Sequence, residues 1–259
     1  MKRRTVLAGL ATGAATALAG CATLSGDVSE GELTGDMDEE EFEAFQSDVG
    51  EAMSETETVS VAREETARSD GGTVQAELEA DINHPAEEMY MEGDISNPLP
   101  TRDGTTFALY IEGTVGYIDE GRDGEWYEVD SEQARDIWDI EDFGSDDPMY
   151  RYGEVHVDAG DEVITVTTEL DGDQLDAATD EMDEELKTEF EEIEFDEYTT
   201  VERFDAETYY LIDIDIDGVG ELDGQDVDVE MWSEMTNINE EVETSVPDEV
   251  RESASTSSS

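Results

Sequence analysis

The chain has 259 residues, of which 75 are Asp or Glu and 12 are Lys or Arg, giving a formal net charge of -63. This length suffices for one large domain or two small ones. So negative a field repels phosphate backbones and excludes nucleic acid as a partner, and the chain also lacks a basic face for binding membranes. Acidic residues alternate with apolar ones instead of forming blocks, which indicates a folded protein with an acidic surface rather than a disordered tail.

The acidic composition resembles the pattern of extreme halophiles, especially haloarchaea, in which Asp and Glu replace surface Lys. After the N-terminal segment, Lys187 is the only lysine. At molar salt the Debye length is about 3 Å, so repulsion among exposed carboxylates is largely screened, whereas dilute buffer leaves it in place. We therefore expect folding to depend on salt.

The N-terminal segment has the three parts of an export signal. Lys2, Arg3 and Arg4 form a cationic start, residues 6–19 form a weakly apolar run, and small residues precede Cys21. The run is shorter than the roughly 20 residues that a permanent bilayer span requires. The pattern predicts a signal over residues 1–20, with lipid attached at Cys21 and the membrane as the resulting partner.

Two resemblances in this segment are specific. Arg3-Arg4-Thr5-Val6-Leu7 resembles a twin-arginine export signal, although Val6 stands where Phe is commoner. Leu18-Ala19-Gly20-Cys21 resembles the lipobox, in which the Cys becomes the lipidated first residue of the mature chain. The alternative is a plain cleaved signal with an incidental Cys. Lipidation is favoured because the chain's single Cys lies in the register that the motif requires.

The mature chain is expected to open with a tether and a helix. Residues 21–37 are polar and without period, which suits a flexible tether. From Asp38, apolar residues recur at three- and four-residue spacing, and Asp38 is placed to cap a helix whose first residues, Glu39-Glu40-Glu41, favour the helix dipole. The pattern predicts an amphipathic helix over residues 39–54.

Strands are expected to dominate from residue 74 onward, because the spacing of apolar residues changes to 2. Asp103-Gly104 and Asp123-Gly124 are typical of tight hairpins between such runs. In residues 210–217, Ile212 and Ile214 alternate with Asp residues and are expected to face the core. The pattern predicts a one-sided antiparallel sheet.

Two further helices are expected. One covers residues 131–140, and the other carries an apolar stripe from Leu175 and Ala178 to Phe190, which should pack against the sheet rather than bind a cofactor. A single domain over residues 38–250 would then be followed by a disordered polar tail, residues 251–259.

This order of elements resembles the LolA-like lipoprotein superfamily, which includes bacterial lipoprotein carriers and actinobacterial lipid-binding lipoproteins. The resemblance covers residues 38–250 and depends on pattern more than on a diagnostic motif. Its pieces are Cys21, a helix ending at Ala52-Met53, repeated hairpins, Tyr117 to Tyr127, Thr208-Tyr209-Tyr210 and a closing stretch from Val246 to Val250.

The resemblance implies a mainly β (α+β) fold: a strongly curved antiparallel sheet, or half-open barrel, with two or three helices covering its concave side. In this family the space between sheet and helices can hold acyl chains or a lipidated peptide. The residues expected to line such a space here are Leu78, Met89, Met91, Phe107, Leu109, Met182, Leu186, Ile212 and Ile214.

Asp213, Asp215 and Asp217, followed by Gly218, form a weak calcium-loop candidate. The match fails at its end, because Gly224 stands where a bidentate Glu is required, and no helix pattern precedes it. Three carboxylates pointing outward from a strand are the better interpretation, so we expect no metal and no cofactor.

No motif indicates catalysis. Acidic pairs are uninformative against so acidic a background, and His84 and His156 are isolated. The expected function is therefore a membrane-anchored extracytoplasmic lipoprotein, not an enzyme, that binds an apolar ligand such as lipid. The alternatives are a cell-surface structural or protein-interaction domain, whose partners stay open, and, less favoured because a βα alternation is missing, a transporter solute-binding subunit.

Overall fold

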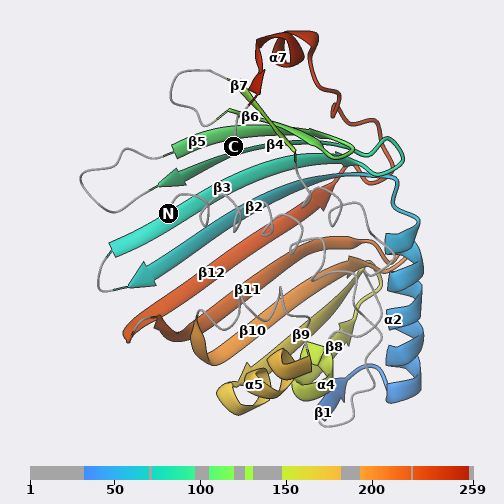
Figure 1. The fold of residues 1–259 in the computed structure, drawn as a ribbon. Helices are drawn as coiled ribbons and strands as arrows, with labels where there is room; N and C mark the ends of the chain where they lie inside the picture. The colour runs from blue at the N-terminus through green and yellow to red at the C-terminus, as the bar shows by residue number, and fades with distance from the viewer. Residues whose placement is uncertain are drawn as a thin grey trace. The chain divides into compact units, whose positions relative to one another are not determined.

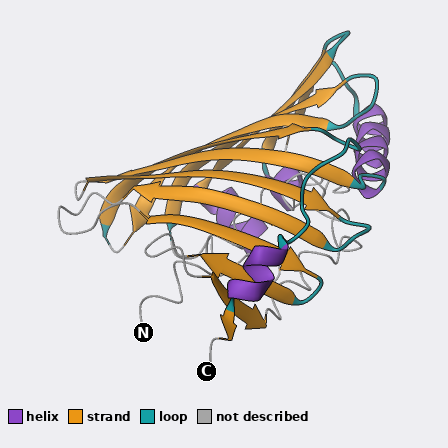
Figure 2. Ribbon diagram, turned by 90° about the horizontal axis from the view of Figure 1, so that it is seen from above, coloured by secondary structure: helices purple, strands orange, loops and turns teal. Residues whose placement is uncertain are grey.

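A computed structural model of the chain describes residues 32–69, 72–96, 105–119, 126–130, 148–181, 193–222 and 224–256. Strands make up most of these residues (Figures 1 and 2). Residues that we expected to form one domain divide into two compact units. Unit 1 comprises Met1–Glu55, Ala67–Asp70 and Glu141–Trp232, and unit 2 comprises Thr56–Thr66, Gly71–Ile140 and Ser233–Ser259.

Unit 1 contains a mixed sheet and three of the described helices. β8 to β11 pair antiparallel in sequence order, and β1 pairs parallel with β8. The strands, in spatial order, are β1 (Glu32–Gly35), β8 (Glu154–Ala159), β9 (Val163–Asp171), β10 (Glu194–Asp205), β11 (Leu211–Leu222) and most of β12 (Gln225–Thr236). The helices are α2 (Glu39–Ser54), α4 (Pro148–Tyr152) and α5 (Gly172–Glu181).

Unit 2 contains a second run of strands and one described helix, α7 (Asp248–Ser253). β3 to β7 pair antiparallel in sequence order, and β13 pairs parallel with β7. The strands, in spatial order, are most of β2 (Thr58–Ser69), β3 (Gly72–Asn83), β4 (Glu88–Ser96), β5 (Thr105–Glu112), β6 (Val115–Asp119), β7 (Trp126–Asp130) and β13 (Ser255–Thr256).

The prediction of a mainly β fold with curved sheets is confirmed (Figure 2). One correction applies, because the sheets are mixed rather than purely antiparallel. The short strands β1 and β13 pair in parallel with β8 and β7. Each of them covers a strand whose backbone would otherwise present unpaired N–H and C=O groups, so the pairing protects an edge against aggregation.

The predicted helix over residues 39–54 is confirmed as α2. The Asp38 carboxylate accepts a hydrogen bond from the Glu41 N–H at 3.0 Å, and the Glu41 carboxylate accepts one from the Asp38 N–H at 3.0 Å. This capping box satisfies two backbone donors that the first turn leaves without partners. The buried face of α2 carries Phe42, Phe45, Gln46 and Val49.

At both ends, the described strands and helices extend beyond the predicted boundaries of the domain. The expected tether, residues 21–37, contains β1, whose Thr34 hydroxyl donates to the Val155 carbonyl at 3.2 Å. The expected disordered tail, residues 251–259, contains the end of α7 and β13. These short segments are ordered by pairing and packing against distant strands, which local periodicity does not report. The expected helix over residues 131–140 lies outside the described residues.

β11 departs from the simple alternation that the sequence predicts. Arg203 pairs with Asp213 and Phe204 pairs with Leu211, so Ile212 is the extra residue of a β-bulge. Leu211 is therefore buried, together with Ile214, while Ile212 is only half-buried. Simple alternation from Ile214 therefore does not place Leu211 on the buried face, because the bulge shifts the parity of the strand.

Candidate functional site

Unit 2 presents a continuous apolar face on β3, β4 and β5, which we call the lining face. Met91 pairs with Ala80 on one side and Leu109 on the other, and Met89 pairs in the same way with Ile82 and Ile111. Partners in an antiparallel ladder share a face. Leu109 is half-buried, and the buried members of the face are Leu78, Ala80, Ile82, Met89, Met91, Phe107 and Ile111.

A glycine shapes one end of the lining face. Gly93 lies between Leu78 and Phe107 in the ladder. A Cβ atom at Gly93 would lie 2.7 Å from the Phe107 ring, closer than real contacts allow. The missing side chain therefore lets the aromatic ring pack directly over the backbone of β4, which keeps the face apolar at a position that has no side chain of its own.

Helix α7 packs on the opposite face of this sheet. Val246 and Val250 cluster with Tyr117, with Tyr110 and Trp126 packed against them. Tyr110 and Tyr117 are partners in the ladder and lie on the face away from Leu109. Burial raises the pKa of Tyr110, with the charge of Glu243 adding to the effect. Helix α7, the one described helix of unit 2, therefore does not cover the lining face.

In unit 1, by contrast, three helices pack on a single sheet face, which we call the helix-covered face. The Phe45 ring of α2 packs edge-on against the Phe204 ring of β10, and the two ring centroids are 5.3 Å apart. α4 contributes Met149, and α5 contributes Leu175 and Ala178, which cluster with Leu170 and Tyr198 of the sheet. The predicted packing of the 175–190 stripe is confirmed for its described part, and so is the prediction that helices cover one side of the sheet.

Buried polar side chains interrupt this apolar face. Glu202 is 2% exposed and lies between Val166 of β9 and Ile214 of β11 in the ladders. The Tyr150 hydroxyl of α4 donates a hydrogen bond to its carboxylate. Burying a carboxylate is costly unless hydrogen bonds compensate for lost water, so this donor stabilises the buried group.

Sequence analysis missed Glu202, although a signal was present. Tyr198 and Phe204, both buried, share the strand parity of Glu202. Alternation along β10 therefore places the Glu on the core side. Against a background of 75 acidic residues, this alternation alone does not distinguish Glu202 from the exposed carboxylates.

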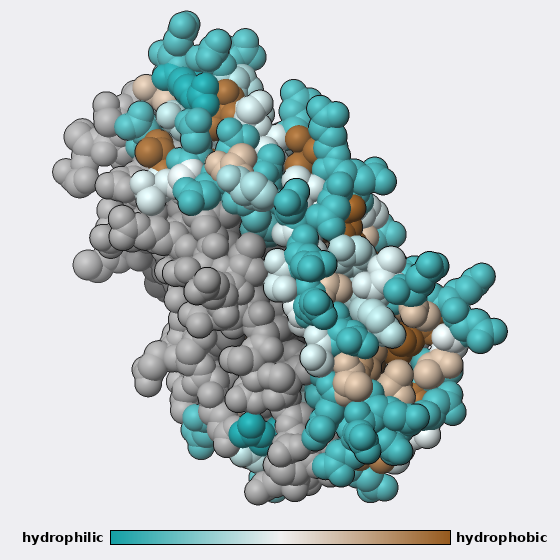
Figure 3. All heavy atoms as spheres, turned by 90° about the vertical axis from the view of Figure 1, so that its right-hand side faces the viewer, coloured by the Kyte–Doolittle hydropathy of each residue, from teal (hydrophilic) through white to brown (hydrophobic). Residues whose placement is uncertain are grey.

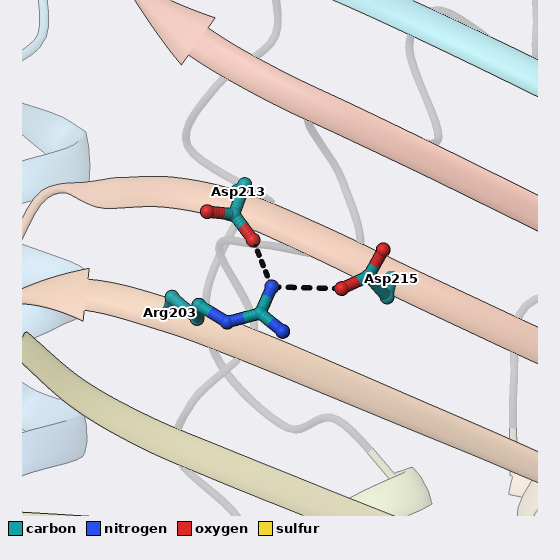
Figure 4. Close-up of polar contacts among 3 residues, drawn as sticks. All are labelled: Arg203, Asp213 and Asp215. Atoms are coloured by element: carbon teal, nitrogen blue, oxygen red, sulfur yellow. Dashed lines mark hydrogen bonds and ion pairs between the residues drawn. The ribbon is translucent and has the colours of Figure 1, made fainter.

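On the outer face of unit 1, Arg203 joins the carboxylates of Asp213 and Asp215 (Figure 4). Its Nη1 donates to both carboxylates, with 2.7 Å to Asp215 Oδ2. The hydrogen bond to Asp215 is the largest of the causes that raise the pKa of Arg203. Two members of the weak calcium candidate are thus paired with a guanidinium, and Asp217 is exposed. Within the described ranges, no group of three or more His, Cys, Asp or Glu side chains could hold a metal ion.

The nine predicted lining residues do not fall into one unit. Leu78, Met89, Met91, Phe107 and Leu109 belong to unit 2, whereas Ile212 and Ile214 belong to unit 1. Met182 and Leu186 lie outside the described residues, as do Cys21, Arg3 and Arg4. Within the part of the chain that the structure describes, no helix is both long and apolar enough to cross a membrane.

Residues 44–255 match DUF6612, a family of unknown function. The chain belongs to DUF6612. Among curated proteins, none matches this DUF6612 chain.

Solved structures similar to this DUF6612 chain include lipoproteins. Lipoprotein LppX from Mycobacterium tuberculosis is 10% identical, with a TM-score of 0.42, covering 78% of this chain and 98% of its own. LprF from Mycobacterium bovis is 15% identical, with a TM-score of 0.42, covering 79% and 95%. A domain described as an outer membrane lipoprotein-sorting protein, from Vibrio parahaemolyticus, is 8% identical, with a TM-score of 0.29, covering 76% and 93%.

Proposed function

We propose that this DUF6612 chain is a membrane-anchored extracytoplasmic lipoprotein that binds an apolar ligand such as lipid and has no catalytic role. The observation that carries the proposal is the lining face of unit 2, where apolar side chains from three adjacent strands adjoin without interruption. Two neighbouring thioethers, Met89 and Met91, lie on its middle strand. Thioether side chains are flexible and polarisable, so they adapt to ligands of irregular shape.

The proposed anchor is lipid on Cys21. β1 begins at Glu32, which is 32 - 21 = 11 residues later. A fully extended segment of that length spans at most about 40 Å. The anchor would therefore keep β1 within about 40 Å of the membrane, which favours local binding of ligand over long-range transport.

The described surface supports ligand binding over a large protein interface. On the face drawn in Figure 3, hydrophilic residues predominate among those described, with apolar ones scattered between them. Within the described ranges, the large hydrophobic side chains that are exposed are Val74, Val219 and Leu222. Stable protein interfaces usually present a contiguous apolar patch, whereas isolated apolar residues are ordinary.

Apolar contact would dominate the affinity. Each square ångström of apolar surface removed from water contributes about 25 cal/mol. Chain length should therefore change the affinity steadily, at about 0.8 kcal/mol for each buried CH₂ group.

Environment-sensitive dyes attached to single cysteines test the lining face directly. Cys21 is the only cysteine, so Cys21→Ser gives a background without thiols. In this background, a dye on Leu109→Cys should shift to the blue when a long-chain fatty acid is added in molar salt. Ala108→Cys is the matched control, because the neighbouring residue lies on the opposite face of β5 and is also half-buried.

The helix-covered face of unit 1 is tested in the same way, separately. Thr200 and Thr199 are adjacent, half-buried and of the same residue type, but only Thr200 shares the face of Glu202. A ligand on this face should shift a dye on Thr200→Cys and not one on Thr199→Cys. If none of the four labels responds, and native mass spectrometry of the protein purified without detergent shows no bound lipid, the structural or interaction alternative is the better one.

A further inference from the structure

Strand β2 extends the lining face of unit 2 by one more strand. It lies beside β3 in the sheet (Figure 1). The His84 N–H donates to the Glu57 carbonyl at 2.9 Å, and the Ser60 hydroxyl donates to the Asp81 carboxylate. Three residues forward along one segment therefore correspond to three residues back along the other, which is an antiparallel register.

This register brings a cation to the edge of the lining face. A further step of three residues along both strands places Arg63 opposite Leu78. The same count leads to Ser69 and Gly72, the residues at which β2 ends and β3 begins. Arg63 belongs to unit 2, as do the strands of the lining face.

Alternation along β2 assigns the Arg63 side chain to the lining side of the sheet. Ser60 contacts Asp81, which alternation places on the face of β3 away from the buried Ala80. Residues of β2 with the opposite parity to Ser60 therefore share the lining face. Val61, two residues before Arg63, is buried as this assignment requires.

Arg63 lies where the lining face changes from buried to exposed. Along this face of β3, Leu78 is 5% exposed, whereas Val74 is 40% exposed. The Arg63 side chain is 16% exposed, and its Nη2 donates to Glu65 Oε2 at 3.0 Å. The Glu65 side chain is 37% exposed, so solvent reaches the ion pair.

An anionic amphiphile is complementary to this arrangement. A guanidinium keeps its charge and carries five N–H donors in a planar fork, so one Arg can bind two carboxylates at once. An acyl chain would lie over side chains such as Leu78 and Phe107, with its charged end at Arg63. The net charge of -63 opposes an anion, but at molar salt the Debye length is about 3 Å, so direct contact with Arg63 outweighs distant carboxylates.

We propose that Arg63 is the headgroup site of the lining face and that the ligand is a long-chain carboxylate. Its chain covers the apolar rows, and its carboxylate shares the guanidinium with Glu65. A single negative charge suits this site, because Glu65 repels further charge. The inference rests on the proposed function and names the polar end of its ligand.

Palmitate, hexadecanol and methyl palmitate test the site, since they share a chain length and differ in the polar end. Their affinities for the Cys21→Ser protein are compared at pH 8 in molar salt by displacement of a neutral fluorescent fatty alcohol. A hydrogen bond to a charged group is strong enough that palmitate should bind about tenfold more tightly than either neutral probe.

Arg63→Met should remove this preference and leave hexadecanol binding unchanged within a few-fold. Arg63→Lys should retain part of the preference, because it keeps a cation without the planar fork. Arg68→Met is the matched control. It removes a cation from the same strand, at a side chain that is 44% exposed, and should leave the preference intact.

Glu65→Gln separates a ligand site from a purely structural ion pair. It removes the carboxylate that competes for Arg63, so palmitate should bind several-fold more tightly while hexadecanol is unaffected. A structural pair would instead make Glu65→Gln and Arg63→Met weaken both probes alike. That result, or equal affinities of palmitate and hexadecanol in the parent, would overturn the headgroup site and leave apolar binding intact. Failure of all three probes to bind would overturn both the headgroup site and the proposed function.

Discussion

Replacing Arg203 by Met should destabilise unit 1 by leaving two carboxylates without their cation. The Arg203 side chain is 37% exposed and that of Asp213 is 19% exposed. A hydrogen bond to a charged group contributes about 1.5–3 kcal/mol when shielded, and an exposed ion pair contributes about 0.2–1 kcal/mol. Because solvent and salt reach this cluster, we discount the shielded value and expect a loss of about 1–2 kcal/mol for both bonds together.

Urea denaturation in 2–4 M NaCl measures this loss, with one control for the residue type and one for the charges. Arg68→Met breaks the ion pair with Glu230, whose side chains are 44% and 53% exposed, and should change stability little. The double variant Arg203→Met/Asp213→Asn should recover part of the loss, because one of the two repelling carboxylates has become neutral. Lower salt should enlarge the effect of Arg203→Met, since repulsion between Asp213 and Asp215 is then less screened.

Two results would refute the reasoning. Equal losses in Arg203→Met and Arg68→Met would show that the partly buried geometry contributes nothing. A rise in the melting temperature of the parent on adding Ca²⁺, abolished by Asp215→Asn, would show that these carboxylates bind the ion in spite of the guanidinium.

Three further predictions concern the anchor, the salt and the turn before β11. Cys21→Ser should move the protein from the membrane fraction to the medium, measured by immunoblot, and retention in the membrane would contradict lipidation. Circular dichroism should show β structure in molar KCl that weakens on dialysis, because a net charge of -63 is then unscreened; cooperative unfolding that is unchanged in dilute buffer would exclude this. Hydrogen bonds from Thr208 lower the pKa of Asp205, so its stabilisation is present above pH 4 and lost as the pH falls through the folded pKa. Asp205→Asn should therefore make stability less sensitive to acid in denaturation at pH 2–5, and an unchanged acid profile would refute the linkage.

Local sequence signals were sufficient to predict helix α2. A capping residue, an acidic first turn and apolar spacing all lie within sixteen residues, and each acts through neighbours in sequence. The same holds for the apolar half of α5, whose Leu175 and Ala178 are buried as the stripe predicts. Elements of this kind can be predicted because the information that positions them is not spread along the chain.

β1, β13 and α7 could not be predicted in the same way. β1 has four residues and β13 has two, which is too short for a period to be read. Their order comes from partners at a distance, such as Thr34 with Val155, and Ser255 with Tyr127. Such pairing is a property of the folded sheet, so composition alone assigned these segments to a tether and a tail.

The bulge in β11 shows how one residue changes the assignment of a strand face. Side chains alternate strictly along a strand, so one inserted residue exchanges inward and outward positions beyond it. The sequence placed Ile212 with Ile214 on the core face, whereas Leu211 and Ile214 are the buried pair. The irregularity adjoins Arg203 and the turn that follows Phe204, where Tyr209 has a φ of 60°. This backbone conformation is uncommon for an aromatic residue. The Tyr209 ring packs near the Phe45 ring, with the two ring centroids 6.1 Å apart.

Glu202 shows why the chemistry of the candidate site was harder to predict than its fold. The residue type that makes the surface acidic also supplies the buried polar group, so composition cannot separate the two roles. Burial separates them: a carboxylate at the surface is solvated and screened by salt, whereas one at 2% exposure needs hydrogen-bond donors from its surroundings. The Tyr150 hydroxyl is one such donor, and it comes from α4, a five-residue helix that the sequence did not predict. The contact between α4 and β10 that accommodates this buried carboxylate is therefore a property of the folded chain, which composition does not report.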